Sequence, residues 1–237
     1  IAPDITPEQI AALKRDGFFV FRGLFDRDEI VALEAIADEA VDYHNRNLAS
    51  DESISKKDRI AFVNSGADRS PVADRLLAFS TQPRVARLAR AIAGPRAAHF
   101  AYQLVYKYPH NPDPFPWHQD DSYTASSTGY FTIWLAISDA TEANGCLRVL
   151  PGKSLDALLP YTMSKLGRTC WPLDDPDQGV AVPIGRGDAV VFTSKMVHAS
   201  GGNRTDAFRK SLIMAFMDAD AVSTRSGEKF NTLAYPT

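Results

Sequence analysis

The sequence predicts a mostly helical N-terminal layer followed by an antiparallel β core within a single domain. The 237 residues, 45% of them hydrophobic, suit one domain with a sizeable core. From residue 98 the helical periodicity gives way to short β-branched and aromatic segments separated by Pro, Gly, Asn and Asp. Strands and helices do not alternate, which argues against a dinucleotide-binding parallel sheet. We therefore expect a mostly helical flank at residues 1–97 and the β core at residues 98–218.

The N-terminal flank opens with clear helix signals. The sequence "TPEQ" at residues 6–9 is a capping box with proline at the first helical position, and Gly17 is a stop signal. The following "FFVFRGLF" predicts a buried strand. Asp26 and Glu29 repeat the capping signal, and apolar residues then recur at helical spacing to about His44. These patterns predict a short helix, a strand and a long amphipathic helix.

The next segment has no period. Residues 45–70, "NRNLASDESISKKDRIAFVNSGADRS", are mostly polar and predict a long loop that is either a lid or disordered. A further helix begins at the "TQP" of residues 81–83 and closes at the Gly-Pro step of residues 94–95.

The β core is predicted from a series of short segments rich in strand-forming residues. The Asn-Gly step at residues 144–145 is the sharpest turn signal between them. The expected strands are "AHFAYQLVYKY", "GYFTIWLAISD", "GCLRVLPG", "DAVVFT" and "RKSLIMAFMD".

Composition excludes several classes of function. The net charge is −3 with both signs well mixed, so no basic face predicts a nucleic-acid or anionic-membrane partner. Cys146 and Cys170 form no C-x-x-C pattern and are expected to be free structural thiols in a reducing compartment. No apolar run reaches the length of a membrane span, and the chain does not begin like a signal peptide. We expect a soluble, cytoplasmic protein with a small-molecule partner.

A candidate metal motif lies in "WHQDDSYTA", residues 117–125. On an extended segment His118 and Asp120 point to the same side, so they can offer a nitrogen and an oxygen to one ion while Gln119 faces away. With His198 as a third ligand they form a 2-His-1-carboxylate triad, which leaves three open positions and suits Fe(II) enzymes that activate oxygen. A solvated His-x-Asp pair and a closed zinc site using His110 remain alternatives.

A second group of residues follows in "VHASGGNRTDAFRKS", residues 197–211. His198 ends the apolar strand "DAVVFTSKMV", a turn forms at residues 201–203, and another strand begins near Phe208. Arg209 can therefore return close to the metal and bind a carboxylate through two of its three guanidinium nitrogens. Ser211 lies on the same face and can add a hydroxyl donor. A surface ion pair is the alternative role for Arg209.

Together these motifs resemble the Fe(II)/2-oxoglutarate oxygenases, and more closely the phytanoyl-CoA dioxygenase family (PhyH). The resemblance spans about residues 6–218 and rests on "DGFFVFRGL", "WHQD", "TIWLAISDATEANGCLRVLPGKS" and "GDAVVF" followed by "H", "S" and "N". It implies a double-stranded β-helix, a cupin-like jelly-roll of two packed sheets with flanking helices. One departure is "PGKS" at residues 151–154, where relatives often have "PGSH".

The resemblance also implies roles for individual residues. His118, Asp120 and His198 would bind Fe(II), and Arg209 would bind the distal carboxylate of 2-oxoglutarate. Further cosubstrate contacts would come from Ser211, Trp134, Gln103 and Lys107. The alternatives are that Trp134 is a core aromatic residue and that Lys107 extends its amine to solvent.

The implied reaction is oxidation of an unactivated C–H bond by O2, most simply hydroxylation, with release of succinate and CO2. Related halogenases replace the carboxylate ligand with a small residue, so Asp120 predicts that this chain does not halogenate. A non-catalytic metal-binding cupin-like protein and a hydrolytic or isomerising metalloenzyme with the same ligands are the rival functions.

The substrate is expected to be a small secondary metabolite or an amino-acid-like molecule, because no basic cluster indicates a coenzyme A thioester. The assembly is expected to be a monomer or a small homo-oligomer. Candidate substrate contacts are Asp121, Ser122 and Tyr123 after the metal motif, Asn64 in the predicted loop, and Trp171.

Overall fold

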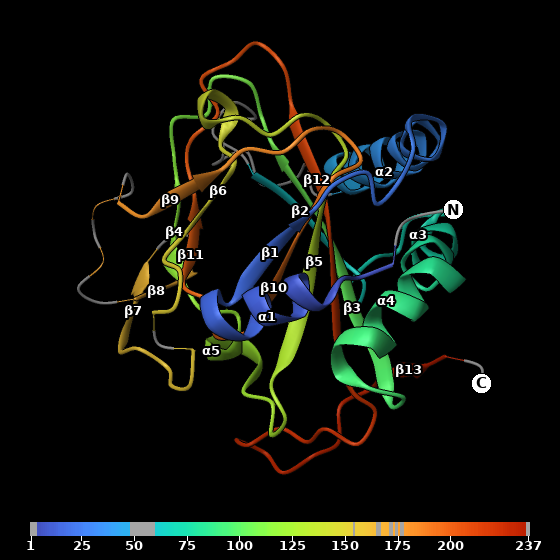
Figure 1. Cartoon of the computed structure of the whole chain (residues 1–237). Coiled ribbons are helices and arrows are strands. Elements are labelled where there is room, and N and C mark those ends of the chain that lie inside the picture. Colours follow the sequence, from blue (N-terminus) through green and yellow to red (C-terminus); the bar gives the residue numbers. More distant parts are fainter. Residues whose placement is uncertain are drawn as a thin grey trace.

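Two antiparallel sheets dominate the computed structural model (Figure 1), which describes residues 4–47, 60–153, 155–164, 167–170, 173, 175 and 178–235. The seven-stranded major sheet runs in the order β1 (Phe18–Phe21), β10 (Ala189–Thr193), β5 (Tyr130–Ala136), β12 (Arg209–Asp218), β3 (Ala97–Lys107) and β13 (Leu233–Ala234), with β2 (Ile60–Asn64) also paired to β3. The four-stranded minor sheet runs β4 (Phe115–His118), β11 (His198–Ser200), β6 (Leu147–Val149) and β9 (Val180–Val182). A separate hairpin joins β7 (Tyr161–Ser164) and β8 (Gly167–Cys170).

Helices cover the outer face of the major sheet. Figure 1 shows α2 (Arg27–Asn47), α3 (Ala73–Ser80) and α4 (Pro83–Ala93) on the side away from the minor sheet. Their buried side chains, such as Leu33, Leu76 and Val85, join one hydrophobic cluster with Leu104 and Leu212 of the sheet. Burial of this apolar face stabilises the layer, since each fully buried aliphatic side chain contributes about 1.5–3 kcal/mol.

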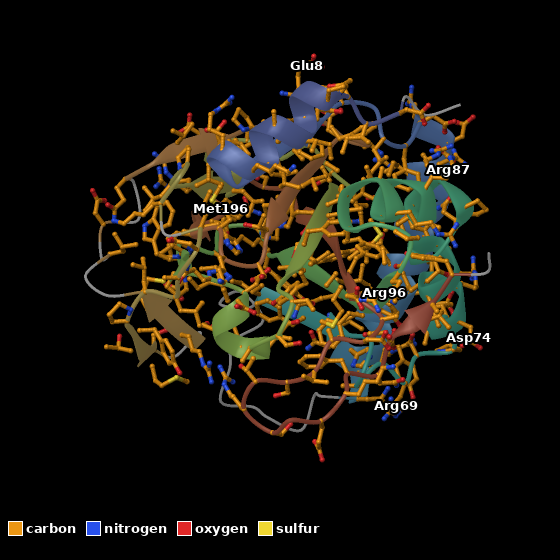
Figure 2. The ribbon with its side chains drawn as sticks, turned by 60° about the horizontal axis from the view of Figure 1, so that its bottom comes forward. Glu8, Arg69, Asp74, Arg87, Arg96 and Met196 are labelled. Carbon is orange, nitrogen blue, oxygen red and sulfur yellow. The ribbon has the colours of Figure 1, made fainter. Side chains whose placement is uncertain are left out.

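The first helix, α1 (Pro7–Asp16), forms as its sequence predicts. The Thr6 hydroxyl accepts from the Gln9 amide, the Gln9 side chain accepts from the Thr6 amide, and Gly17 ends the helix with φ +85°. Figure 2 labels Glu8 of this helix, which lies at the surface. Asp74 of α3 and Arg87 of α4, labelled in the same view, are also exposed, whereas Met196 is fully buried.

Alternation along β12 assigns its two faces to two different cores. Leu212, Met214 and Phe216 point into the helix-facing cluster. Arg209 and Ile213 lie on the other face, toward the minor sheet, because successive strand residues point to opposite sides. The space between the sheets is filled by a second cluster that contains Trp134 and Phe192 of the major sheet and, from the minor sheet, Leu147, Val149 and Val182. The expected jelly-roll class is therefore confirmed.

The predicted loop at residues 45–70 is partly wrong. Residues 60–64, "IAFVN", form β2 and pair with the C-terminal half of β3, where Asn64 lies opposite Gln103. The segment is short and flanked by polar residues, so its strand signal is weak until a partner edge exists. The helical flank therefore supplies two strands, β1 and β2, to the major sheet, and β13 adds a third from beyond residue 218.

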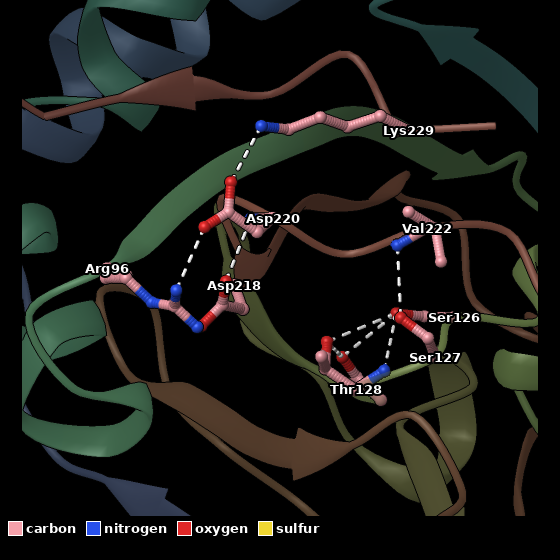
Figure 3. A network of polar contacts seen from close by, with 9 residues as sticks. Arg96, Ser126, Ser127, Thr128, Asp218, Asp220, Val222 and Lys229 are labelled. Carbon is pink, nitrogen blue, oxygen red and sulfur yellow. Dashed lines mark hydrogen bonds and ion pairs between the residues drawn. The ribbon is translucent and has the colours of Figure 1, made fainter.

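Polar networks connect the layers at their edges. Lys210 of β12 bonds Glu34 and Asp38 of α2, both at 2.8 Å. At the C-terminal end of β12, Arg96 bonds Asp218 and Asp220, and Lys229 returns to Asp220 (Figure 3). Both cysteines are buried and free, as predicted. In the described part of the chain, no helix is long and apolar enough to cross a membrane.

Candidate metal and cosubstrate site

The two predicted histidine ligands face each other across a pair of strands. His118 ends β4 and His198 begins β11, and the two residues are direct partners in the antiparallel ladder. Their ring centroids are 4.0 Å apart. The expectation that His198 ends the strand "DAVVFTSKMV" is wrong, because β10 ends at Thr193 and the chain then crosses to the minor sheet. This crossover puts His198 beside His118.

Asp120 completes the group, although its backbone is not extended. Its φ of −58° and ψ of −37° are helical, and the short helix α5 (Asp121–Thr124) follows directly. The carboxylate Oδ1 lies 3.5 Å from His118 Nε2 and 3.6 Å from His198 Nε2. The three ligand atoms lie within 4.8 Å of one another, and these are the residues that form a potential metal cluster in the described structure. The structure brings the three predicted residues together, and the turn rather than strand alternation places Asp120 beside the histidines.

Backbone carbonyls fix the tautomer of both histidines. His118 Nδ1 lies 2.8 Å from the Pro116 carbonyl oxygen, and His198 Nδ1 lies 3.0 Å from that of Met196. A carbonyl oxygen only accepts, so each Nδ1 carries a proton, and Nε2, which faces Asp120, is the nitrogen of each ring that is left to bind a metal. This arrangement orients metal-ligating histidines.

The charges in the group also suit a cation. Burial, followed by the neighbouring His118, lowers the pKa of His198 to about 4, so its ring is neutral near pH 7. Burial opposes ionisation of Asp120, yet the nearby histidines and a hydrogen bond from Thr132 outweigh it and lower the pKa of this carboxyl. Two imidazoles and one carboxylate are a normal ligand set for a divalent metal.

Thr132 was not predicted from the sequence. It lies on β5 of the opposite sheet, is fully buried, and donates from Oγ1 to Asp120 Oδ2 at 3.2 Å. This bond holds one carboxylate oxygen and leaves Oδ1 facing the two histidines. A threonine on a strand carries no local signal of this contact, because the partner lies 12 residues earlier in another part of the fold.

Arg209 lies where the sequence places it, on the returning strand. Its side chain is buried, its Nη1 donates to Ser211 Oγ at 2.7 Å, and its guanidinium stacks over the Trp134 ring at 5.1 Å. Its Nε has no hydrogen-bond partner, and no carboxylate of the described residues pairs with it. Burial lowers the pKa of Arg209 to about 10, so it remains charged at neutral pH. An exposed ion pair, the alternative role, is excluded.

Lys107 does not extend to solvent. Its side chain is completely buried, and Nζ donates to the carbonyl oxygens of Ser200 and Gly201, beside the strand that carries His198. Burial, followed by the positive charge of Arg209, lowers the pKa of Lys107 well below its usual value. Lys107 and Arg209 are partners across β3 and β12, so two basic side chains share this end of the site, of which Arg209 is the cationic group.

The metal group and the cationic group line one cavity of about 510 Å³. A buried guanidinium without an anionic partner is costly, so its surroundings fit a ligand carboxylate. Ser211 Oγ, which donates to the Val105 carbonyl, holds the guanidinium from one side, and Trp134 covers it from another. The residues present therefore fit a divalent metal at His118, Asp120 and His198 and a ligand carboxylate at Arg209 in the same cavity.

Of the predicted substrate residues, some line the cavity and others do not. Asn64 and Tyr123 line the cavity. Asp121 and Ser122 are buried and are not part of its described wall; Asp121 instead accepts from the Ser126 amide at 3.1 Å. Trp171 lies outside the described residues. Asn64 sits on a strand rather than in a lid, and Gln103 bonds it at 2.5 Å. His110 is exposed and pairs with Asp206, so it is not part of the metal group.

Comparison with known proteins assigns the family. The sequence model of the phytanoyl-CoA dioxygenase family (PhyH) matches residues 13–211. The chain belongs to the phytanoyl-CoA dioxygenase family. Peroxisomal phytanoyl-CoA dioxygenase of Homo sapiens is 26% identical over 91% of this chain and 69% of its own length. Ectoine dioxygenase of Sphingopyxis alaskensis is 26% identical over 95% of this chain and 79% of its own.

Solved structures agree on the fold of this phytanoyl-CoA dioxygenase family member. The non-heme alpha-ketoglutarate-dependent carbocyclase SnoK of nogalamycin biosynthesis superposes with a TM-score of 0.77 at 18% identity, covering 99% of this chain and 98% of SnoK. The cofactors of the family are Fe(II), 2-oxoglutarate and O2, which is the combination of metal and dicarboxylate that the residues of this cavity fit.

Proposed function

We propose that this chain is an Fe(II)- and 2-oxoglutarate-dependent dioxygenase that hydroxylates an unactivated C–H bond of a small molecule, releasing succinate and CO2. The observation that carries the proposal is the buried, unpaired Arg209 in the same cavity as the His118, Asp120 and His198 group. Neither rival function, a metal-binding protein without catalysis or a zinc hydrolase or isomerase, requires a buried guanidinium beside the metal ligands.

Each side chain of the site then has a defined task. His118, Asp120 and His198 hold the metal, and the Nδ1 hydrogen bonds keep both imidazoles in the ligating tautomer. Arg209, held by Ser211 and covered by Trp134, binds and orients the distal carboxylate. When bound, the iron and its cosubstrate supply the oxidation of the C–H bond by O2. The apolar walls exclude water from the reacting groups.

Asp120 supports hydroxylation over halogenation. Its carboxylate lies beside both histidines and is held there by Thr132, so it would fill the ligand position that a halide takes in the halogenases. SnoK is a carbocyclase and the Sphingopyxis alaskensis relative is an ectoine dioxygenase. One oxidising centre therefore serves several outcomes among similar proteins. We infer oxygen insertion here, and a chlorinated product in the presence of chloride would refute that choice.

The test is anaerobic addition of Fe(II) and 2-oxoglutarate, followed by visible absorption. We expect a charge-transfer band in the wild type, and loss of saturable 2-oxoglutarate binding in Arg209→Ala. Arg204→Ala removes an exposed arginine of the same turn and should leave the band unchanged. Oxygen is then admitted and succinate is measured. A wild-type protein without the band would sink the cosubstrate assignment, and a band without any succinate would indicate a binding protein.

We further propose that the chain works in a reducing compartment such as the cytoplasm, as a monomer or small homo-oligomer. The two cysteines support this, because both are free and buried. Size-exclusion chromatography with light scattering measures the assembly, and fluorescence imaging of the tagged protein in its native host tests the location.

A further inference from the structure

The charged groups of the cavity are already used by the metal and the cosubstrate. In the described wall, the ionisable side chains other than tyrosines are His118, Asp120 and His198 at the metal, and Lys107 and Arg209 at the cosubstrate end. Burial raises the pKa of Tyr130 well above its usual value, so this residue stays neutral. A charged group on the substrate would therefore lose water here without gaining a partner, which is unfavourable.

Aromatic rings form the wall that remains. Phe62 of β2 meets the edge of Phe115 at 5.9 Å between centroids, and Phe115 meets His118 at 4.8 Å. On another part of the wall, Phe100 lies 6.2 Å from Tyr130. Phe62, Phe100, Phe115 and Tyr130 are all only half-buried, so ring surface is exposed to the cavity. Such surfaces favour offset or edge contacts with a flat ring.

A pair of amides interrupts this apolar wall. Asn64 and Gln103 are partners across β2 and β3, and the Gln103 amide nitrogen donates to Asn64 Oδ1 at 2.5 Å. Among the described residues, one oxygen and one nitrogen of the pair have no other hydrogen-bond partner, and this holds whichever way the amides are turned. Both residues line the cavity. The pair can therefore accept from and donate to one neutral group, such as a carboxamide or a hydroxyl.

We propose that the substrate is an uncharged molecule with a planar ring, whose neutral hydrogen-bonding group is held by Asn64 and Gln103. This proposal rests on the function proposed above, because it takes Arg209 to be occupied by the cosubstrate. The cavity volume of about 510 Å³ lies within the range of small-molecule sites. β2, with Ile60, Phe62 and Asn64 on one face, is the strand that selects the substrate.

Calorimetry with matched probes tests this substrate class. The protein is held anaerobically with Fe(II) and saturating 2-oxoglutarate, so that carboxylate probes do not bind at Arg209. We expect 2-naphthamide to bind at least tenfold more tightly than 2-naphthoate, L-leucine or octanoyl-CoA, and more tightly than octanamide. Equal or tighter binding of any charged probe overturns the uncharged class, and so does an absence of binding by 2-naphthamide.

Two variants test the residues. Asn64→Ala should weaken 2-naphthamide binding by about fivefold, the effect of losing one neutral hydrogen bond. Asn231→Ala, an exposed asparagine near the C-terminus, should change nothing. Phe62→Leu should abolish the preference for 2-naphthamide over octanamide. An unchanged affinity in Asn64→Ala or an unchanged preference in Phe62→Leu contradicts the role given to that residue.

Failure of the substrate class is distinguishable from failure of the function. If the wild type shows no charge-transfer band with Fe(II) and 2-oxoglutarate, the dioxygenase function fails, whatever the probes do. If the band forms but a charged probe binds best, the function stands and the substrate class is wrong.

Discussion

Replacing Thr132 by valine is expected to weaken Fe(II) binding by roughly 10–100-fold without unfolding the protein. Valine has the same shape but lacks the hydroxyl that donates to Asp120 Oδ2 at 3.2 Å. A hydrogen bond to a charged group contributes about 1.5–3 kcal/mol, which corresponds to that range of affinity, and loss of a contact behind a metal ligand costs about the same. The freed carboxylate can rotate, so Oδ1 no longer faces both histidines.

The assay is an anaerobic Fe(II) titration against a competing chelator, which measures affinity independently of turnover. Thr132→Ser keeps the hydroxyl and should restore most of the affinity. Thr193→Val is the matched control, because the Thr193 hydroxyl is also buried but has no hydrogen-bond partner. If Thr132→Val and Thr193→Val bind Fe(II) equally well, the bond to Asp120 does not position the ligand.

Two further predictions concern stability. Burial lowers the pKa of His99 to about 4, whereas the same side chain in the unfolded protein has a pKa of about 6.5. Below about pH 6.5 the unfolded chain therefore binds a proton that the folded chain does not bind, so the free energy of unfolding decreases as the pH falls. Between pH 7 and pH 5 this should remove about 2 kcal/mol of the free energy of unfolding, seen in urea titrations as a smaller pH dependence in His99→Leu; equal pH dependence in both proteins would refute it. Gly145→Ala should lower the free energy of unfolding by roughly 1–3 kcal/mol, because φ is +85° and the added Cβ would lie 2.3 Å from the Gly201 carbonyl oxygen. Gly23→Ala, at φ +61° in open space, should lose less, and equal losses would show that the close approach costs nothing.

The grouping of His118, Asp120 and His198 was predictable because its signals are local. The His-x-Asp motif, the later histidine and the arginine 11 residues beyond it each occur in a short segment with its own turn or strand pattern. Their order along the sequence limits the ways in which the later segments can fold back beside the His-x-Asp motif. The sequence could not show that Asp120 begins a helical turn, because a single residue at the end of a strand carries no periodicity.

Contacts between residues far apart in the sequence could not be predicted, because they carry no local sequence signal. β2 is five residues long and becomes a strand by pairing with the edge of β3, so propensity alone indicates a loop. Lys107 was open to two interpretations on its strand. It is buried because the turn after β11 brings the carbonyls of Ser200 and Gly201 over its amine, a contact 93 and 94 residues away.

The division of the site between two sheets has a consequence for how mutations act. The histidines belong to the minor sheet, whereas Arg209, Ser211 and Trp134 belong to the major sheet. Side chains such as Val149 and Phe192, packed between the sheets, therefore set the distance between the two histidines and the Arg209 guanidinium. A change in the volume of these side chains changes that distance. Substitutions in the hydrophobic core can thus change the activity of such an enzyme while every residue that contacts a ligand stays the same.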